Sequence, residues 1–126
     1  MKTLTIIDTF GFFFRSFYAL PPLKNKEGFP TGLLLGFCNL LNNLYKDKNC
    51  DYILFALEGQ GKNRRKILDP RYKQNRQEVP KELLLQLPIA IEWIQKMGFV
   101  NLSVDGYEAD DVIASVSVLA HKKGLN

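Results

Sequence analysis

Residue types that commonly bind zinc are scarce in this chain of 126 residues. It has one histidine, His121, and two cysteines, Cys38 and Cys50, which are not at metal-ligand spacing. This scarcity argues against a zinc site. We expect both cysteines to be buried or half-buried thiols in a cytoplasmic protein.

The chain also lacks a long uninterrupted apolar run. No stretch reaches the roughly 18 uncharged apolar residues that a membrane span requires. Asp8 and Arg15 interrupt the apolar N-terminal segment, and no small-residue cleavage site follows it, which argues against a signal peptide. The 46% hydrophobic and 24% charged residues are instead typical of one globular domain with no membrane contact.

Apolar segments alternate between strand-like and helix-like patterns. Short apolar runs predict strands at residues 4–8, 51–57 and 99–104. Helical spacing predicts helices at 10–20, 31–46, 81–97 and 107–123. The third helix would turn inward Leu83, Leu84, Leu87, Ile91 and Ile94, and the last would turn inward Val112, Ile113, Val116, Leu119 and Ala120. This order predicts an α/β fold with a mainly parallel sheet and helices on both faces. A further strand would normally follow the last helix, so we expect a truncated domain.

Five acids follow the ends of the predicted strands. Asp8 ends the first strand, Glu58 follows the second, and Glu108, Asp110 and Asp111 follow the third, at the start of its helix. Ligands bind at the carboxyl edge of open parallel sheets. Because these acids are far apart in sequence yet converge on one edge, they predict an oxygen-ligand site for Mg²⁺ or Mn²⁺.

Each acid also has a simpler interpretation. Asp8 could cap the following helix, and Glu58 could be a solvated loop residue. A helix dipole favours acids in its first turn by ~0.3–1 kcal/mol each, which explains one or two of the last three acids. Glu108 and Asp111 share a helix face and repel each other, whereas Asp110 points elsewhere. Either a metal or the positive end of a helix would hold this group together.

Basic residues are concentrated in one segment. Between Lys62 and Arg76 lie seven basic residues and one acid, a net charge of +6, which leaves −2 for the rest of the chain. Such a cluster neutralises phosphates as nucleic acid approaches. Lying directly after Glu58, the segment would cover the acidic edge, although a solvated charged loop explains the composition equally well. Metal-holding acids beneath a basic cover suit the hydrolysis of phosphodiesters.

Several motifs resemble the N-terminal part of the 5′-nuclease family, which includes the flap endonucleases and the 5′-nuclease domain of bacterial DNA polymerase I. They are Asp8 followed by Arg15 and Ser-Phe-Tyr-Ala-Leu, Pro30-Thr31-Gly32 with Gly36-Phe37, Tyr72 through Arg76, and Gly106 through Ser115. The resemblance covers nearly the whole chain, as the N-terminal part of a nuclease domain whose C-terminal part is absent, with a basic, arch-like segment at 62–80. It implies a PIN-like α/β fold, 5′-3′ exonuclease or flap endonuclease activity on DNA, and two divalent ions.

The resemblance also implies roles for particular residues. Asp8, Glu58, Glu108, Asp110 and Asp111 would be metal-site acids. Lys73 and Arg76 would act at the scissile phosphate, and Tyr72 would stack on a base. Further contacts to DNA would come from Arg15, Lys62, Arg64, Arg65 and Lys66.

Two departures from the family pattern leave alternatives open. Glu58 stands where the family usually has Asp, and Thr9 replaces a common glycine. We therefore weigh an active nuclease, with a polymerase domain in the same parent chain, against a DNA-binding relic without catalysis. A receiver-type signalling domain would also gather acids at this edge, but Thr9 stands where its second acid would be. An unpaired sheet edge would favour a dimer.

Overall fold

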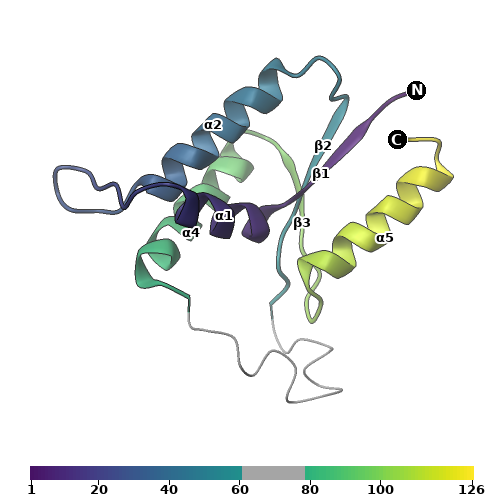
Figure 1. Ribbon diagram of the computed structural model, residues 1–126. Coiled ribbons are helices and arrows are strands. Elements are labelled where there is room, and N and C mark those ends of the chain that lie inside the picture. The colour runs from purple at the N-terminus through teal and green to yellow at the C-terminus, as the bar shows by residue number, and fades with distance from the viewer. Residues whose placement is uncertain (61–78) are drawn as a thin grey trace.

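The computed structural model describes residues 1–60 and 79–126, which form three parallel strands and four helices (Figure 1). The strands are β1 (Leu4–Asp8), β2 (Tyr52–Ala56) and β3 (Val100–Leu102). They pair in the order β1-β2-β3, with Asp8 opposite Ala56 and Ala56 opposite Leu102. The strands therefore end together at one edge, which confirms the predicted parallel sheet.

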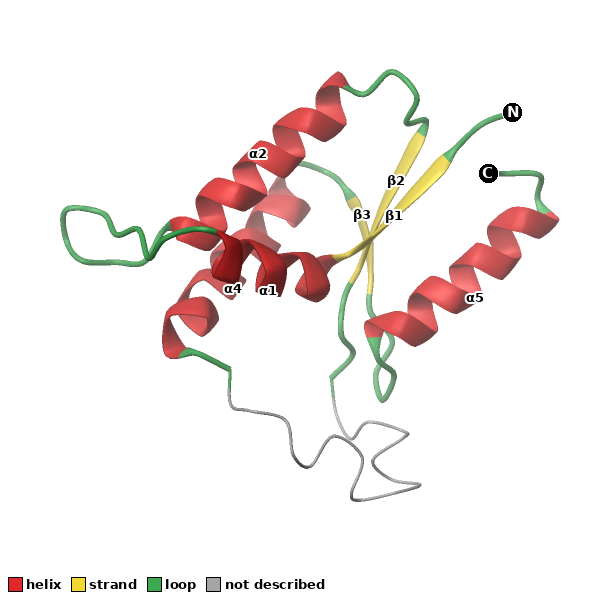
Figure 2. Cartoon of the chain, in the orientation of Figure 1, coloured by secondary structure: helices red, strands yellow, loops and turns green. Residues whose placement is uncertain are grey.

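Helices cover both faces of this sheet, also as predicted. Figure 2 shows α1 (Thr9–Ala19), α2 (Gly32–Lys46) and α4 (Lys81–Lys96) on one side of the strands, and α5 (Ala109–Lys122) on the other. α5 packs on β1 and β2. Within the described ranges, no helix has the length and apolar character needed to cross a membrane.

The two faces of the sheet have cores of different size. Successive strand residues point to opposite faces, so Phe55 joins the core under α1, α2 and α4, while Ala56 joins the core under α5. The fully buried residues of the α5 core are Ala56, Ala109 and Val112, and Ile6, Ile113 and Val116 pack against them partly buried. The larger core is mostly aromatic and aliphatic and consists of Phe13, Leu33, Leu34, Phe37, Leu41, Phe55, Leu83, Ala90 and Ile94.

Three burial predictions were wrong. Leu84 is 50% exposed, because the buried stripe of α4 runs through Leu83, Gln86, Ala90 and Ile94 instead. Leu119 is 57% exposed, because the buried residues of α5, Ala109 and Val112, lie at its N-terminal end. Cys38 is exposed rather than buried, whereas Cys50 is half-buried as expected.

Among residues 1–60 and 79–126, the outer edge of β1 is paired at one position. The Asn126 N–H donates to the Lys2 carbonyl oxygen at 3.0 Å, and the Leu4 N–H donates to the Asn126 carbonyl oxygen at 2.8 Å. These two bonds form the pattern of a parallel bridge. The further strand that the sequence led us to expect after the last helix stays a prediction.

Candidate active site

The carboxyl ends of β1 and β2 and the start of α5 lie at the same end of the sheet (Figure 1). Asp8 is the last residue of β1, and Glu58 lies two residues beyond the end of β2. After β3 the chain turns at Gly106, whose φ is +83°, and then enters α5. The parallel topology thus delivers all five predicted acids to one region.

Asp8 is held as the N-cap of α1. Its half-buried side chain accepts the Gly11 N–H at 3.2 Å, so it satisfies one of the donors that the start of a helix leaves open. A Cβ at Gly11 would lie 2.5 Å from Asp8 Oδ2, which shows why a residue without a side chain occupies that position. The simple interpretation of Asp8 as a helix cap is therefore realised.

Glu58 reaches from the end of β2 to the first residue of α5. Its Oε2 accepts the Ala109 N–H at 3.1 Å. The backbone holds the two segments together, because the Leu57 N–H donates to the Leu102 carbonyl oxygen at 2.9 Å and the Gly59 N–H donates to that of Tyr107 at 3.0 Å. Glu58 is thus an exposed loop acid that also contacts α5 through this hydrogen bond.

Glu108 and Asp111 form a capping box at the same helix end. The Glu108 N–H donates to Asp111 Oδ2 at 3.1 Å, and the Glu108 residue is only 4% exposed. Reciprocal bonds of this kind satisfy backbone donors at both positions. Asp110, between them, is exposed, in line with the prediction that it points elsewhere.

The positive end of α5 therefore gathers three of the predicted metal acids, Glu58, Glu108 and Asp111. Both the helix dipole and the open backbone donors favour carboxylates there. Among residues 1–60 and 79–126, no three Asp, Glu, His or Cys side chains lie close enough together to hold one metal ion. The donor chemistry, carboxylate oxygens only, suits Mg²⁺ or Mn²⁺, but Asp8, Glu58, Glu108 and Asp111 serve as helix caps in this arrangement.

Most of the predicted DNA-binding residues lie outside the described part of the chain. They are Lys62, Arg64, Arg65, Lys66, Tyr72, Lys73 and Arg76. Arg15 is described and is an exposed residue of α1, where it is open to solvent and to a ligand. These roles stay predictions.

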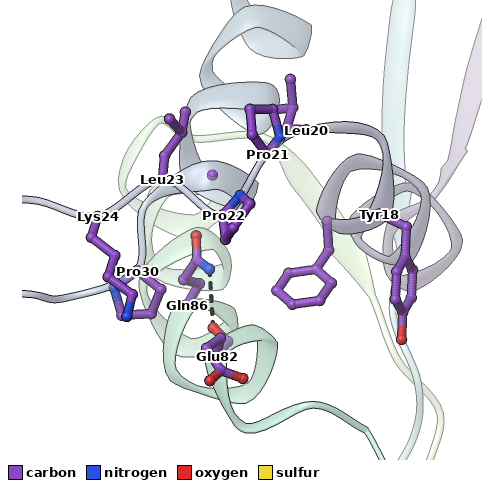
Figure 3. A pocket seen from close by; sticks show the side chains of 11 residues that line it. Tyr18, Leu20, Pro21, Pro22, Leu23, Lys24, Pro30, Glu82 and Gln86 are labelled. Atoms are coloured by element: carbon purple, nitrogen blue, oxygen red, sulfur yellow. Dashed lines mark hydrogen bonds between the residues drawn. The ribbon is translucent and has the colours of Figure 1, made fainter.

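A cavity of about 380 Å³ lies away from the acids, between the end of α1, the loop that follows it and the start of α4. Figure 3 shows Gln86 beside this cavity, where its Nε2 donates to the Glu82 carbonyl oxygen at 3.0 Å. The Gln86 Oε1 accepts the Leu34 N–H at 3.1 Å. The cavity lining includes two aromatic residues and three prolines, namely Phe17, Tyr18, Pro21, Pro22 and Pro30. None of the predicted acids lines it, so this cavity is separate from the candidate site.

Two contributors to the site were missed in the sequence. The Ala109 backbone N–H binds Glu58, and a main-chain donor leaves no trace in residue type. Gly59 lies so close to Val104 that a Cβ would overlap the Val104 carbonyl oxygen. The glycine was visible in the sequence, but it gave a reason only to end the strand.

The fold matches those of two solved T5 proteins. T5 5′-exonuclease with bound zinc has a TM-score of 0.65 and 19% sequence identity, over 97% of this chain and 45% of that chain. A T5 protein co-crystallised with metal ions has a TM-score of 0.69, also at 19% identity, over 94% of this chain and 45% of that one. At this identity the likeness defines the class of fold, a PIN-like α/β domain.

The sequence then gives the family. Residues 3–126 match the model described as 5′-3′ exonuclease, N-terminal resolvase-like domain, and the chain belongs to that family. It is 54% identical over 125 residues to DNA polymerase I of Helicobacter pylori, covering 96% of this chain and 14% of that protein. It is 39% identical over 125 residues to the 5′-3′ exonuclease of Aquifex aeolicus, and this match covers 99% of this chain and 43% of that protein. The chain thus spans less than half the length of either relative. The family resemblance is confirmed, and it replaces the receiver-type alternative.

Proposed function

We propose that residues 1–126 are the N-terminal part of the nuclease domain of a 5′-3′ exonuclease or 5′-flap endonuclease acting in DNA replication and repair. The match over residues 3–126 to a 5′-3′ exonuclease family carries this proposal. Acids from three strand ends at one sheet edge support it, because such edges bind ligands. The reaction would be hydrolysis of a DNA phosphodiester, and the C-terminal part of the domain would lie beyond this region.

The proposed cofactor is a divalent cation, Mg²⁺ or Mn²⁺, with two ions in the complete domain. The T5 structures, one with bound zinc and one crystallised with metal ions, support the use of a divalent cation, and the carboxylate donors favour Mg²⁺ or Mn²⁺. When bound, such an ion activates water and stabilises charge on the phosphate. Among the described acids, Asp8, Asp110 and Asp111 are our proposed ligands together with Glu108. Glu58, assigned with them from the sequence, is considered separately below.

The cationic residues would bind the DNA backbone. Arg15 and the basic residues of segment 62–76 would neutralise phosphates, with Lys73 and Arg76 at the scissile one, and Tyr72 would stack on a base. Binding should therefore weaken as salt concentration rises. On duplex DNA, the logarithm of the binding constant should fall against the logarithm of the salt concentration with a slope of about 0.9 per phosphate contact. Replacing Arg64 and Arg65 together by Ala should lower the magnitude of that slope by about the amount expected for two phosphate contacts.

The partners proposed for this region follow the relatives. A polymerase domain in the same parent chain is supported by the match to DNA polymerase I, of which this chain covers 14%. Self-association through an open strand edge is a weaker proposal. Its support is that β1 is paired on its outer side only at Asn126 among the described residues.

Nuclease activity is tested with a longer polypeptide that contains these 126 residues and with the chain alone. Both are incubated with 5′-flap DNA, with Mg²⁺ or Mn²⁺ and with excess chelator, and a fully paired duplex serves as the control substrate. We expect metal-dependent removal of the flap by the longer protein and weak or no cleavage by the chain alone. No cleavage by a longer protein whose folding is shown by circular dichroism would refute the catalytic proposal.

A second candidate, a DNA-binding relic, is favoured by one observation: Glu58 engages Ala109. The relic would bind flap DNA in a salt-dependent manner without turnover, and Glu58→Asp in the longer protein would restore cleavage. The relic is rejected if the unaltered longer protein cleaves flap DNA and binds it as tightly as the Glu58→Asp variant does.

A further inference from the structure

The contact between Glu58 and Ala109 joins residues that are 51 positions apart in sequence. Ala109 is the first residue of α5, so its N–H is one of the donors for which the helix itself has no acceptor. Capping by a distant side chain ties the helix to another element, which a local cap cannot do. Here the other element is the end of β2.

The surrounding backbone fixes where the Glu58 side chain begins. Leu57 and Gly59, on either side of it, donate to the carbonyl oxygens of Leu102 and Tyr107 at 2.9 and 3.0 Å. The Gly106 N–H returns a bond to the Gln60 carbonyl oxygen at 2.8 Å. With the main chain held on both sides, the length of the side chain at position 58 decides whether its carboxylate reaches Ala109.

Side-chain length is what separates glutamate from aspartate at this position. A glutamate has one methylene more than an aspartate, and Glu58 uses this reach to place Oε2 at 3.1 Å from the Ala109 nitrogen. A metal ligand is chosen for its charge and for the position of its oxygen atoms. A cap needs only an acceptor at the right distance, and a glutamine supplies one as well.

We propose that Glu58 is a positioning residue, not a metal ligand: its side chain holds the start of α5, and with it Asp110 and Asp111, against the end of β2. The role does not depend on whether the chain cleaves DNA. A helix cap and a metal ligand at position 58 should tolerate substitutions in opposite orders. A cap of this length tolerates Glu58→Gln better than Glu58→Asp, whereas a ligand tolerates Glu58→Asp better than Glu58→Gln.

The test compares Glu58→Gln, Glu58→Asp and Glu58→Ala in the 126-residue chain, in chelator, by amide hydrogen exchange measured with NMR. We expect the Ala109 amide to exchange within about threefold of the parent rate in Glu58→Gln. In Glu58→Asp and Glu58→Ala it should exchange at least about tenfold faster, the factor that corresponds to loss of a bond of about 1.4 kcal/mol. The Gly11 amide, capped by Asp8, should be unchanged in all three.

Glu92→Gln is the matched control for loss of one negative charge, because Glu92 pairs with Lys96 on the exposed side of α4. It should leave the Ala109 amide unchanged. If Glu58→Ala does not fold, the comparison of Glu58→Gln with Glu58→Asp still decides. Normal Ala109 exchange in Glu58→Asp with rapid exchange in Glu58→Gln overturns the proposal, as does normal exchange in all three variants.

Mn²⁺ binding, followed by water-proton relaxation, gives an independent readout. If Glu58 positions the helix, Glu58→Gln keeps the Mn²⁺ affinity of the parent chain within about twofold, and a tenfold or larger loss overturns the proposal. If the parent chain does not bind Mn²⁺, the proposed metal site fails while the Ala109 exchange rates still decide the role of Glu58.

Discussion

The buried Gln86 side chain accepts the Leu34 N–H at 3.1 Å, across 52 residues of sequence. Leu34 is in the first turn of α2, so the bond satisfies an open helix donor, and Thr31 at the N-cap makes no side-chain cap. Gln86 on α4 therefore caps α2 in the same manner in which Glu58 caps α5. Two of the helices begin on acceptors supplied from distant positions in the chain.

Gln86→Leu removes the acceptor and leaves the Leu34 N–H buried without it. Because an unsatisfied buried donor costs about 1–3 kcal/mol, we expect a loss of that size in the free energy of unfolding. Urea denaturation followed by circular dichroism measures it. Gln95→Leu, on the exposed surface of the same helix, is the matched control and should change stability by less than about 0.5 kcal/mol. Equal effects of the two changes would contradict the capping role.

Asp8 has two roles that substitution can separate. Asp8→Asn keeps an oxygen acceptor for the Gly11 N–H, so stability should change by a few tenths of a kcal/mol, whereas Asp8→Ala should cost about 1 kcal/mol. Both changes remove the charge that the proposed metal site needs. We expect both variants to lose Mn²⁺ affinity, measured by titration calorimetry, while only Asp8→Ala is less stable to urea. Unchanged Mn²⁺ affinity in both variants would argue that Asp8 is a cap alone.

Removal of divalent ions should leave this chain folded. The described acids near α5 are held by backbone donors, so their mutual repulsion is already offset. We expect the melting temperature in excess chelator to lie within about 2 °C of its value without added metal, given that 1 kcal/mol shifts a domain of this size by roughly 4 °C. Differential scanning calorimetry measures it. A protein that unfolds in chelator would show instead that a metal ion is part of its folded state.

Gly59→Ala tests the close approach of the chain after β2 to the chain after β3. Its Cβ would overlap the Val104 carbonyl oxygen, which is main chain and cannot rotate away. We expect a loss of about 2–4 kcal/mol in the free energy of unfolding, in the range of severe single substitutions. Gly28→Ala, in a loop with φ of +83° and open space around the new Cβ, is the control and should cost about 1–2 kcal/mol. A milder effect at Gly59 than at Gly28 would be inconsistent with the contact.

Much of the fold could be predicted from the sequence. Apolar runs ending in Asp8 and just before Glu58 marked two strands, and helical spacing marked the helices to within a few residues. The α/β alternation then required a parallel sheet with the acids at its carboxyl edge. These features repeat along the chain or follow from topology, so a single sequence displays them.

Other features depended on contacts that only the folded chain makes. Leu84 matched the apolar spacing of α4, yet Gln86 occupies the core because the Leu34 N–H gives it a partner. Leu119 matched the spacing of α5, but the helix is buried mainly near its start. For the acids, the sequence left a metal and a helix end as alternatives, and it gave no sign that Glu58 would reach Ala109. The helix-capping contact of Glu58 depends on the main-chain N–H of Ala109, which lies 51 residues away.

The small core beneath α5 has a consequence for the order in which the molecule opens. The layer of α1, α2 and α4 is anchored by large side chains such as Phe13, Phe37 and Ile94, whereas α5 is anchored by Ala56, Ala109 and Val112. Elements with little buried apolar surface separate at a lower free energy than the global unfolding transition. We therefore expect α5 to detach first among the described helices, and the acids at its start to disperse with it while the three-helix layer and the strands stay folded.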